Sequence, residues 1–486
     1  MESHKKSAIK VKIGDIIEQL DLTAHQWHTI FFTWWIWICI GWVLTSAVYM
    51  MDAAGEVSSA WITLTSPSDR LTVQDKSLAV LAGGAIAVVA SPIFGSFGDV
   101  LGRVITTKIC IAASTVVMIG FGLARSKLML LVIFCLNPAT AAISITQSLL
   151  TEWLPVRWRG MFTVSLHVLW NVGRLAVTVL WAALPPKNHW MTFFLVASVP
   201  GLMLATYICL RGWRYESPRW LAVRGDLVGC VTVLKLMATS SAGNAAMPAG
   251  WDEPGNLQVE DDSGMAVQAH KESTRQQLAE LMQPEKLWLV ALLGITSLSI
   301  NWASTSIFFW VMEYFKTVGL RAAIVPTMVV APLGKIASNA LIIVGGPGAC
   351  LIDCCTRVPL MQVGYFGFGI CLALLCVTRS VIAVTLLMFF AMVFEELVWT
   401  SGSIYMTELF PTTIRNTALG IIAAVGSVGA ILGVALYGIG TEMWVYLPMV
   451  VMVCFLFFGG AVCFLFSEDR RQKTLSDTIG YGACKA

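Results

Sequence analysis

Four ionisable side chains lie inside long apolar runs of this sequence: Arg174, Lys335, Glu395 and Glu396. A charge near the middle of a bilayer costs about 3 kcal/mol on insertion scales, so each of them favours a functional interpretation. A carboxylate there could attract a cation or carry a coupling proton, and a lysine or an arginine could bind substrate or take part in coupling. The structural alternative is that Arg174 or Lys335 only neutralises a glutamate and holds two helices together.

Glu395 and Glu396 are neighbours in the sequence, and neighbours on an α-helix point about 100° apart. Only one of the two is therefore expected to face a central cavity squarely. The other is expected to pair with a neighbouring group or to be protonated. This pair is the first candidate for cation attraction or proton coupling.

Uncharged side chains in the same runs could also contact a substrate. The candidates for hydrogen bonding are Asn171 and Asn301, with Asn137, and those for stacking on an organic ion are Trp170 and Trp399, with Trp302 and Trp310. Most of the 19 tryptophans are expected to pack or to anchor the chain at the membrane interface. His167 is expected to be a packed or hydrogen-bonded residue rather than a proton carrier.

No cofactor or metal ion is indicated. Cys350, Cys354 and Cys355 crowd together, but no histidine or second CxxC pair accompanies them, so we expect no metal site. The sequence has no P-loop lysine motif, hydrolase elbow or zinc-binding helix, which argues against an ATP-driven pump and an enzyme. Its 32 basic and 29 acidic residues are nearly balanced, which argues against a nucleic-acid partner.

Membrane-spanning helices must position these side chains. The 486 residues are 57% hydrophobic and only 13% charged, against about 25% charged in soluble domains, so lipid is the expected solvent. A helix needs about 20 residues to cross a bilayer. Twelve runs qualify, at 27–50, 77–98, 104–124, 128–150, 160–182, 190–211, 287–311, 322–346, 358–377, 381–405, 416–438 and 442–466.

The spans divide six and six around a polar linker. The predicted parts are a cytosolic tail (1–26), a six-helix bundle (27–211), a cytosolic linker (212–285), a second bundle (286–467) and a cytosolic tail (468–486). The linker is expected to be helical at its ends and disordered in its middle. With both termini cytosolic, 22 lysines and arginines lie inside and eight outside, which fits the positive-inside rule. The first span begins too late for a cleaved signal peptide, so we expect it to be retained.

The two halves carry matching polar residues. Asp99 and Arg103 match Asp353 and Arg357, Glu152 and Arg159 match Glu408 and Arg415, and Glu216 and Arg219 match Glu468 and Arg471. The offsets are 254, 256 and 252 residues, and every copy lies at a predicted cytosolic helix end. We infer a duplicated six-helix unit, in which substrate sites lie near the midplane between the halves.

Three stretches resemble the major facilitator superfamily. "GSFGDVLGR" (95–103) resembles its loop 2–3 motif, and "ESPRWL" (216–221) is similar to the motif after helix 6 in its sugar and organic-ion branches. "ELFPTTIRNTALG" (408–420) is similar to the loop 10–11 motif of the organic cation/anion transporter family. The resemblance implies an all-α membrane fold of twelve transmembrane helices in two pseudo-symmetric six-helix bundles, with helices 5, 8 and 10 bordering the cavity.

The resemblance also implies that charged residues in these motifs close the cytosolic side. Asp99 would pair with an arginine or accept hydrogen bonds from the N-terminal amides of a neighbouring helix. The full set of expected gating residues is Asp99, Gly102, Arg103, Glu152, Arg159, Glu216, Arg219, Asp353, Arg357, Glu408 and Arg415. The alternative is that they only flank the spans and solvate the interface.

The sequence also departs from the family pattern. Val100 and Val104 stand where the family usually has a basic residue. The loop after the first span is short, which is more like the synaptic-vesicle-glycoprotein-related members. The eleventh span has no charged residue near Ser427, so the usual clue to substrate charge is missing.

We therefore expect a multi-pass plasma-membrane protein that moves a small organic ion by alternating access, with an organic cation favoured over an anion. Its partners would be the substrate, the lipid bilayer and either a coupling proton or a counter-substrate. Two alternatives stay open. One is a sugar or carboxylate porter of the same superfamily, and the other is a receptor-like or vesicle membrane protein that does not transport.

Overall fold

The computed structural model describes residues 11–20, 22–53, 73–124, 126–135, 141–184, 192–193, 195–196, 198–201, 203, 207, 215–239, 247–260, 266–267, 281–344 and 356–466. Within these residues, ten helices are long and apolar enough to cross a membrane. The predictions for Asn137, the three crowded cysteines, Asp353, Glu468 and Arg471 lie outside the described residues.

The N-terminal half is built from helices that match the predicted spans closely. They are α2 (Ala24–Ala53), α3 (Val73–Val100), α4 (Arg103–Leu123), α5 (Lys127–Cys135), α6 (Ala141–Trp153) and α7 (Val156–Ala183). The predicted run at 128–150 falls on α5 and α6. In the run at 190–211, every described residue is helical.

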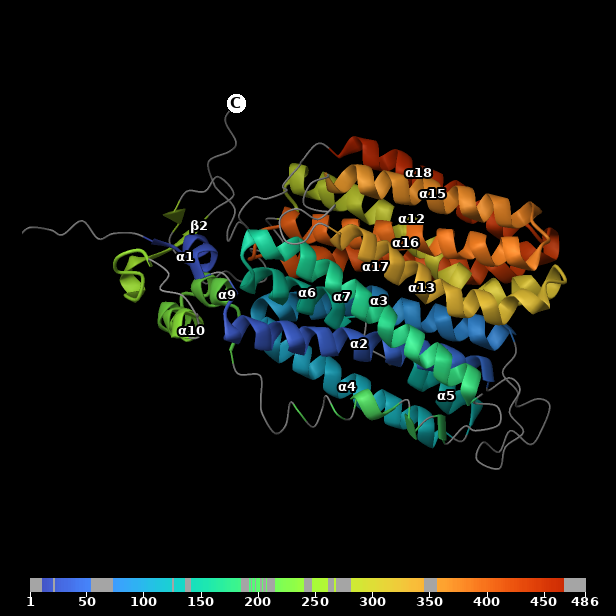
Figure 1. Ribbon diagram of the computed structural model, residues 1–486, viewed down its shortest axis with the longest axis horizontal. Helices are drawn as coiled ribbons and strands as arrows, with labels where there is room; N and C mark the ends of the chain where they lie inside the picture. Colours follow the sequence, from blue (N-terminus) through green and yellow to red (C-terminus); the bar gives the residue numbers. More distant parts are fainter. Residues whose placement is uncertain are drawn as a thin grey trace, which may run out of the picture.

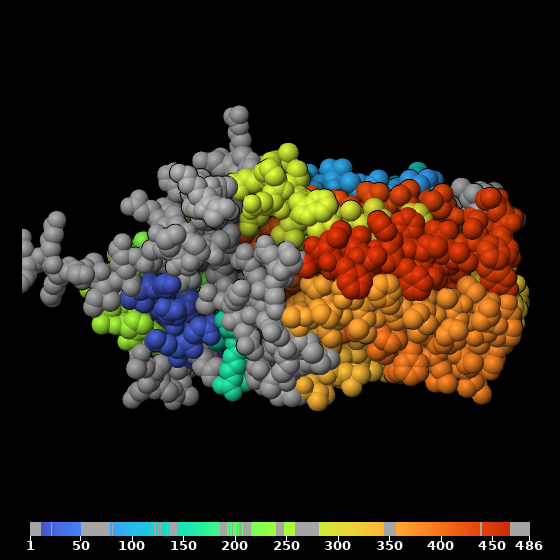
Figure 2. All heavy atoms as spheres, turned by 90° about the horizontal axis from the view of Figure 1, so that it is seen from above, coloured from blue at the N-terminus to red at the C-terminus, as the bar shows by residue number. Residues whose placement is uncertain are grey.

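The C-terminal half repeats this arrangement. Its helices are α12 (Pro284–Thr317), α13 (Ile324–Ile343), α15 (Arg357–Val377), α16 (Val381–Leu409), α17 (Arg415–Met443) and α18 (Leu447–Val462), with 3₁₀ turns η3 (Arg321–Ala323) and η4 (Cys463–Leu465). The two halves lie side by side with their long helices roughly aligned (Figure 1). Figure 2 shows one face of the molecule, which α15, α18 and α12 largely cover.

Among the described residues, the most extensive packing between the halves is made by two helix pairs: α3 packs along α17, and α7 packs along α13. The first pair approaches closely because glycines face its contact. A Cβ at Gly95 would lie 2.3 Å from the Asn416 carbonyl oxygen, and one at Gly420 would lie 2.6 Å from the Ser91 oxygen. Small residues of this kind let helix backbones approach in a membrane, where close packing drives association.

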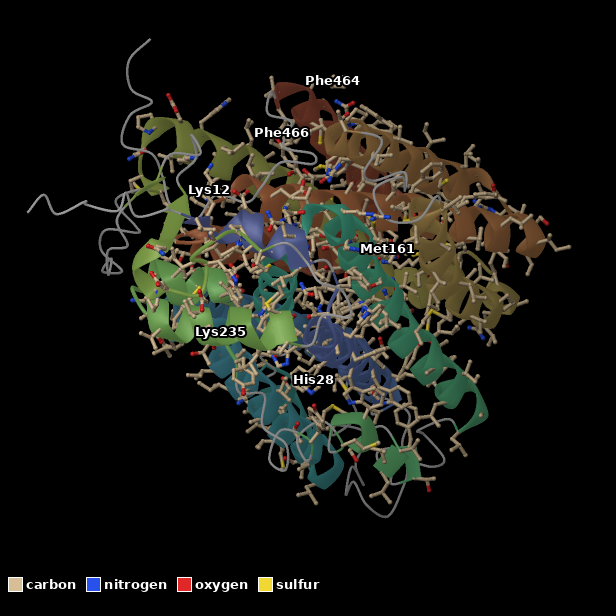
Figure 3. The ribbon with its side chains drawn as sticks, turned by 60° about the vertical axis from the view of Figure 1, so that its left-hand side comes forward. Lys12, His28, Met161, Lys235, Phe464 and Phe466 are labelled. Carbon is tan, nitrogen blue, oxygen red and sulfur yellow. The ribbon has the colours of Figure 1, made fainter. Side chains whose placement is uncertain are left out.

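One end of the bundle carries a small module (Figure 1). The helices at the start of the linker were expected from the sequence, but the strands and the docked N-terminal helix were not. It contains β1 (Val11–Lys12), α1 (Ile13–Leu20), α9 (Pro218–Val223), α10 (Leu227–Thr239), η2 (Pro254–Asn256), β2 (Leu257–Glu260) and β3 (Ala266–Val267). The strand β2 pairs parallel with β1 and antiparallel with β3. Lys12 and Lys235 are labelled on this module in Figure 3, and His28 on α2 next to it. We call this the α9 end.

The helix α1 belongs to the module because its apolar side chains recur with helical spacing. Ile13, Ile16, Ile17 and Leu20 are all buried, at the i, i+3, i+4 and i+7 positions of one face. The expectation of a disordered linker middle is wrong for residues 247–260, which form a turn, η2 and β2. Burial of Leu257 beside α1 gives this stretch a core to fold against.

Candidate functional site

A cavity of about 560 Å³ lies between the two halves. The N-terminal half contributes Trp37, Gly84, Gln147, His167, Trp170 and Arg174, and the C-terminal half contributes Asn301, Phe308, Lys335, Glu395, Glu396, Trp399 and Ser427, among others. All four ionisable residues predicted from the apolar runs therefore line one cavity. Its walls come from α2, α3, α6 and α7 on one side and from α12, α13, α15, α16 and α17 on the other.

Lys335 on α13 pairs with both glutamates of α16. Its Nζ lies 2.8 Å from Glu395 Oε1 and 3.5 Å from Glu396 Oε2. The exposed fractions are 5% for Lys335 and 3% for each glutamate, so the ions are almost fully desolvated. A buried charge requires a partner, and here one ammonium group serves two carboxylates. Both glutamates line the cavity, although the sequence led us to expect only one to face it.

Glu396 has two further partners. Asn339 Nδ2 donates a hydrogen bond of 3.0 Å to Glu396 Oε1, and Thr400 Oγ1 donates one of 2.7 Å to Asn339 Oδ1. His167 Nδ1 lies 3.3 Å from Glu396 Oε1 and comes from the opposite half of the molecule. We call His167, Lys335, Asn339, Glu395 and Glu396 the central cluster. With a neutral histidine its formal charge is −1.

Arg174 stands apart from the central cluster. Its guanidinium carbon lies 4.7 Å from the centre of the Phe308 ring, a cation–π distance that joins α7 to α12. Among the described residues no carboxylate pairs with this guanidinium. The structural alternative, that a basic residue only neutralises a glutamate, therefore describes Lys335 and not Arg174.

Of the uncharged residues that could contact a substrate, some line the cavity and others do not. Trp170, Trp399 and Asn301 line the cavity. Asn301 Nδ2 donates to the Ser297 carbonyl at 2.8 Å, and Trp399 Nε1 donates to Ser304 Oγ at 3.2 Å. Outside the cavity lining, Asn171 is buried and donates to the His167 carbonyl, Trp302 stacks on Phe455, and Trp310 stacks on Tyr437.

At the α9 end, Asp99 ties the last turn of α3 to the first turn of α17. Its carboxylate accepts hydrogen bonds from Asn416 Nδ2 at 3.0 Å, from the Thr417 backbone amide at 2.8 Å and from Thr417 Oγ1 at 2.9 Å. A carboxylate at a helix N-terminus also interacts favourably with the helix dipole. All three bonds cross between the halves, as the resemblance led us to expect of this residue.

A second set of contacts crosses at the same place. Arg103 Nη2 donates to Glu152 Oε1 at 3.1 Å and to the Thr412 carbonyl at 2.9 Å, and it lies 3.2 Å from Asp99 Oδ1. Arg415 Nη1, from the other half, donates to the same Glu152 oxygen at 2.7 Å. Asp99, Arg103, Glu152, Arg415, Asn416 and Thr417 form what we call the latch. Within the latch, one carboxylate oxygen of Glu152 accepts hydrogen bonds from both Arg103 and Arg415.

Residues of α9 and the turn before it hold the α3–α4 turn in place. Glu216 accepts from the amides of Arg103 at 3.1 Å and Val104 at 2.8 Å, and so caps α4. Burial raises the pKa of the Glu216 carboxyl, against the opposing effect of Arg103 and of the α4 amides. On the α3 side, Trp220 Nε1 and Arg224 Nη2 donate to the Asp99 carbonyl. The "ESPRWL" stretch therefore positions the aspartate and the arginine of the latch.

Gly102 gives the first mutational prediction. Its φ is +112°, and a Cβ there would lie 2.5 Å from Glu216 Oε1. We expect Gly102→Ala to cost about 1–3 kcal/mol of backbone strain and also to displace the Glu216 carboxylate that caps α4. Gly225→Ala is the matched control, because Gly225 has φ +81° and open space around it. Thermal unfolding of the purified protein should show the larger loss for Gly102→Ala, and equal losses would contradict the capping role.

Those of the remaining gating candidates that the structure describes lie at the α9 end too. Arg357 makes a two-pronged contact with Glu408, with Nε to Oε2 at 3.2 Å and Nη2 to Oε1 at 3.1 Å. This contact repeats the Arg103 and Glu152 pair at the duplicated positions. Arg159 and Arg219 are buried, and Arg159 lies within electrostatic reach of Glu408.

Sequence reasoning missed several of these contacts. Asn416 and Thr417 stood inside a quoted motif without a role, and Asn339 carried no charge to mark it. His167 was expected to be packed or hydrogen-bonded, and it is, but its partners Glu396 and Ser403 were not predicted. Glu18 on α1 accepts a 2.7 Å hydrogen bond from the Val156 amide and so caps α7. The sequence feature that could have indicated this contact is the apolar periodicity of residues 13–20, which predicts a docked helix rather than a free tail.

Comparisons of the sequence with known proteins identify transporters and related membrane proteins. The family model described as "Sugar (and other) transporter" matches residues 29–475. The chain is 24% identical over 362 residues to the synaptic vesicle 2-related protein of Bos taurus, covering 69% of this chain and 62% of that relative. It is 23% identical over 416 residues to organic anion transporter 3 of Rattus norvegicus, covering 81% of this chain and 69% of that protein.

A solved structure shows the same fold. The proton:xylose symporter XylE, a major facilitator superfamily protein bound to 6-bromo-6-deoxy-D-glucose, superimposes with a TM-score of 0.69. The match covers 92% of this chain and 98% of that one at 15% identity. The all-α fold of twelve transmembrane helices in two pseudo-symmetric bundles, expected from the sequence, is confirmed.

Proposed function

This chain belongs to the sugar (and other) transporter family of the major facilitator superfamily, and we propose that it moves a small organic ion across a membrane by alternating access. The observation that carries the proposal is a cavity between two halves, with two basic and two acidic residues in its lining and inter-half hydrogen bonds at one end. A transporter of this kind is a multi-pass membrane protein and not an enzyme.

In the proposed cycle the bundles 27–211 and 286–467 rock about the cavity. The α9 end is cytosolic, with the tails 1–26 and 468–486 and the linker 212–285. The latch closes this end, because its bonds join α3 and α6 to α17 and must break when the halves separate there. Rocking of two repeats around a fixed midplane site is the general behaviour of such folds.

The cavity lining supports an organic ion rather than a sugar. Its C-terminal wall carries methionines, namely Met328, Met361, Met388, Met392 and Met406, and its N-terminal wall carries Trp37 and Trp170. Methionine and tryptophan accommodate varied apolar or aromatic bodies. A sugar would leave many hydroxyl groups without partners on such a surface, and burying an unpaired hydroxyl is costly.

We propose an organic cation as the substrate, because Lys335, Glu395 and Glu396 together carry a formal charge of −1. Aromatic rings such as those of Trp170 and Trp399 would add cation–π attraction. A second candidate is an organic anion, which Arg174 favours because its guanidinium faces the cavity without a carboxylate partner among the described residues. The coupling partner is either a proton or a counter-substrate.

Uptake by proteoliposomes containing the full chain tests this choice. We expect saturable uptake of tetraethylammonium that hexoses do not inhibit. Glu395→Gln should reduce it about tenfold or more, because the net charge of the three residues becomes zero, whereas Arg174→Gln should change it little. Arg379→Gln is a control, since this arginine also stacks on a ring, that of Tyr446, but lies outside the cavity.

Other results of the same uptake assay would support the alternative functions. Uptake of benzoate that Arg174→Gln abolishes, without uptake of tetraethylammonium, would favour the organic anion. Uptake of a hexose would contradict both candidates. If no substrate is taken up above the level of protein-free vesicles, a receptor-like or vesicle role replaces transport. We propose the plasma membrane as the location, which surface labelling of intact cells would test.

A further inference from the structure

His167 is the residue through which the N-terminal half touches the central cluster. It lies on α7, lines the cavity and is 8% exposed. Its Nδ1 is 3.3 Å from Glu396 Oε1, and its Nε2 is 2.9 Å from Ser403 Oγ. Both contacts reach α16, so this imidazole joins the two halves at the level of the cavity, away from the latch.

Both ring nitrogens face hydrogen-bond acceptors. Glu396 Oε1 is a carboxylate oxygen, which can only accept while the glutamate is ionised. Ser403 Oγ donates its own hydrogen to the Thr400 carbonyl at 3.0 Å, which leaves a lone pair toward the imidazole. A neutral histidine has one N–H and a protonated histidine has two. With the Ser403 hydroxyl on Thr400, the imidazolium is hydrogen-bonded at both nitrogens. When that hydroxyl turns toward the ring, it serves the neutral form that donates from Nδ1 to Glu396. The surroundings therefore accommodate both protonation states, as a group that binds and releases a proton requires.

The formal charges around His167 leave a deficit of one positive charge. On α16 it faces Glu396 and, next to it, Glu395, and on α13 it faces Lys335, for a sum of −1. On its own helix, Arg174 is seven residues away, a rise of about 10 Å. The packed neighbours α2 and α6 present Trp37 and Thr146 here.

The other titratable side chains described on these two neighbours make contacts elsewhere. His25, His28 and Glu152 lie at the α9 end. Cys39 Sγ donates to the Pro200 carbonyl, and the Tyr49 hydroxyl pairs with Thr178 Oγ1. A proton on His167 would therefore bring the central cluster from −1 to zero.

We propose that His167 is the proton-binding site that couples transport to a proton gradient. The inference rests on the proposed transport function and adds its coupling ion. A proton from the outer solution binds the lone pair of one imidazole nitrogen, and the imidazolium holds α7 against Glu396. When the halves rearrange, the same N–H bond breaks and the proton leaves to the other solution. No other reactant is needed for this step.

Proteoliposome assays separate coupling from transport itself. With tetraethylammonium inside and outside, exchange at equal pH measures movement of the substrate. With an outside pH of about 5.5 and an inside pH of about 7.5, uptake should rise above the level at equal pH, because the outer solution then supplies the proton and the inner solution removes it. His167→Gln should lose this stimulation and the accompanying proton influx, which an enclosed pH dye reports. The readout is the ratio of gradient-driven uptake to equal-pH exchange in the same vesicles, so a lower exchange rate in the variant does not imitate a loss of coupling. His28→Gln is the control, at a histidine outside the cavity.

A second measurement does not depend on substrate. The Trp37 ring lies 5.1 Å from the His167 ring, and a protonated histidine quenches tryptophan emission on contact. His25 lies 5.6 Å from the Trp153 ring, so the comparison is made in a His25→Gln background. There we expect an emission change between pH 5 and 8 in the purified protein that both His167→Gln and Trp37→Phe remove. Gradient stimulation or this titration persisting in His167→Gln would overturn the proposal. Exchange without any pH dependence in the unaltered protein would also overturn it. Absence of all exchange would instead count against the proposed transport function.

Discussion

Asp99→Asn is expected to reduce substrate uptake by at least about tenfold while the protein still reaches the membrane. Asp99 accepts three hydrogen bonds from Asn416 and Thr417, and all of them cross between the halves. Hydrogen bonds to a charged group contribute about 1.5–3 kcal/mol each. Losing part of this energy destabilises the state closed at the α9 end, and a change of about 1.4 kcal/mol shifts the balance of the two states tenfold.

Hydrogen exchange gives a direct readout of this change. The amide of Thr417 loses its charged acceptor in Asp99→Asn, so peptides covering the start of α17 should exchange faster. Asp226→Asn is the matched control, because Asp226 caps α10 by accepting from the Gly229 amide at 2.8 Å within the linker module. Unchanged uptake, or a loss of uptake that only follows a loss of protein from the membrane, would contradict the role of the latch.

Lys335→Met is expected to lower the stability of the folded protein by about 3–5 kcal/mol and to abolish transport. The methionine has a similar length but no charge, so two buried carboxylates would be left beside each other without their shared ammonium group. Thermal unfolding in detergent, followed by size-exclusion fluorescence, measures the first effect, and uptake measures the second.

A second substitution distinguishes charge balance from packing. Lys335→Met with Glu395→Gln should recover most of the stability, because the remaining Glu396 keeps Asn339 and His167 as partners. Transport should not recover, since the charge pattern of the cavity is changed. The control is Lys316→Met, whose pair with Glu313 at 3.4 Å is 40–44% exposed and should be worth at most about 1 kcal/mol. Equal losses for Lys316→Met and Lys335→Met would argue against the buried cluster.

The sequence by itself determined the membrane class, nearly all of the helices and the family. Apolar runs of about 20 residues have one stable solution in lipid, because every backbone amide must bond within its own helix. It also singled out charged residues that the structure brings together. Lys335 and Glu395 are charges inside apolar runs, where charge is costly, and Asp99 and Glu152 belong to the motifs repeated at the predicted cytosolic helix ends.

Only the tertiary structure decided how these residues combine. Lys335 and Glu395 lie 60 residues apart, and Glu152 and Arg415 lie 263 apart, so their pairing depends on which helix faces meet. The same packing turned His167 toward Glu396, left Arg174 on Phe308 and placed Glu18 on the first turn of α7. Helix periodicity shows which side chains share a face, but the partner of that face is a property of the packed bundle.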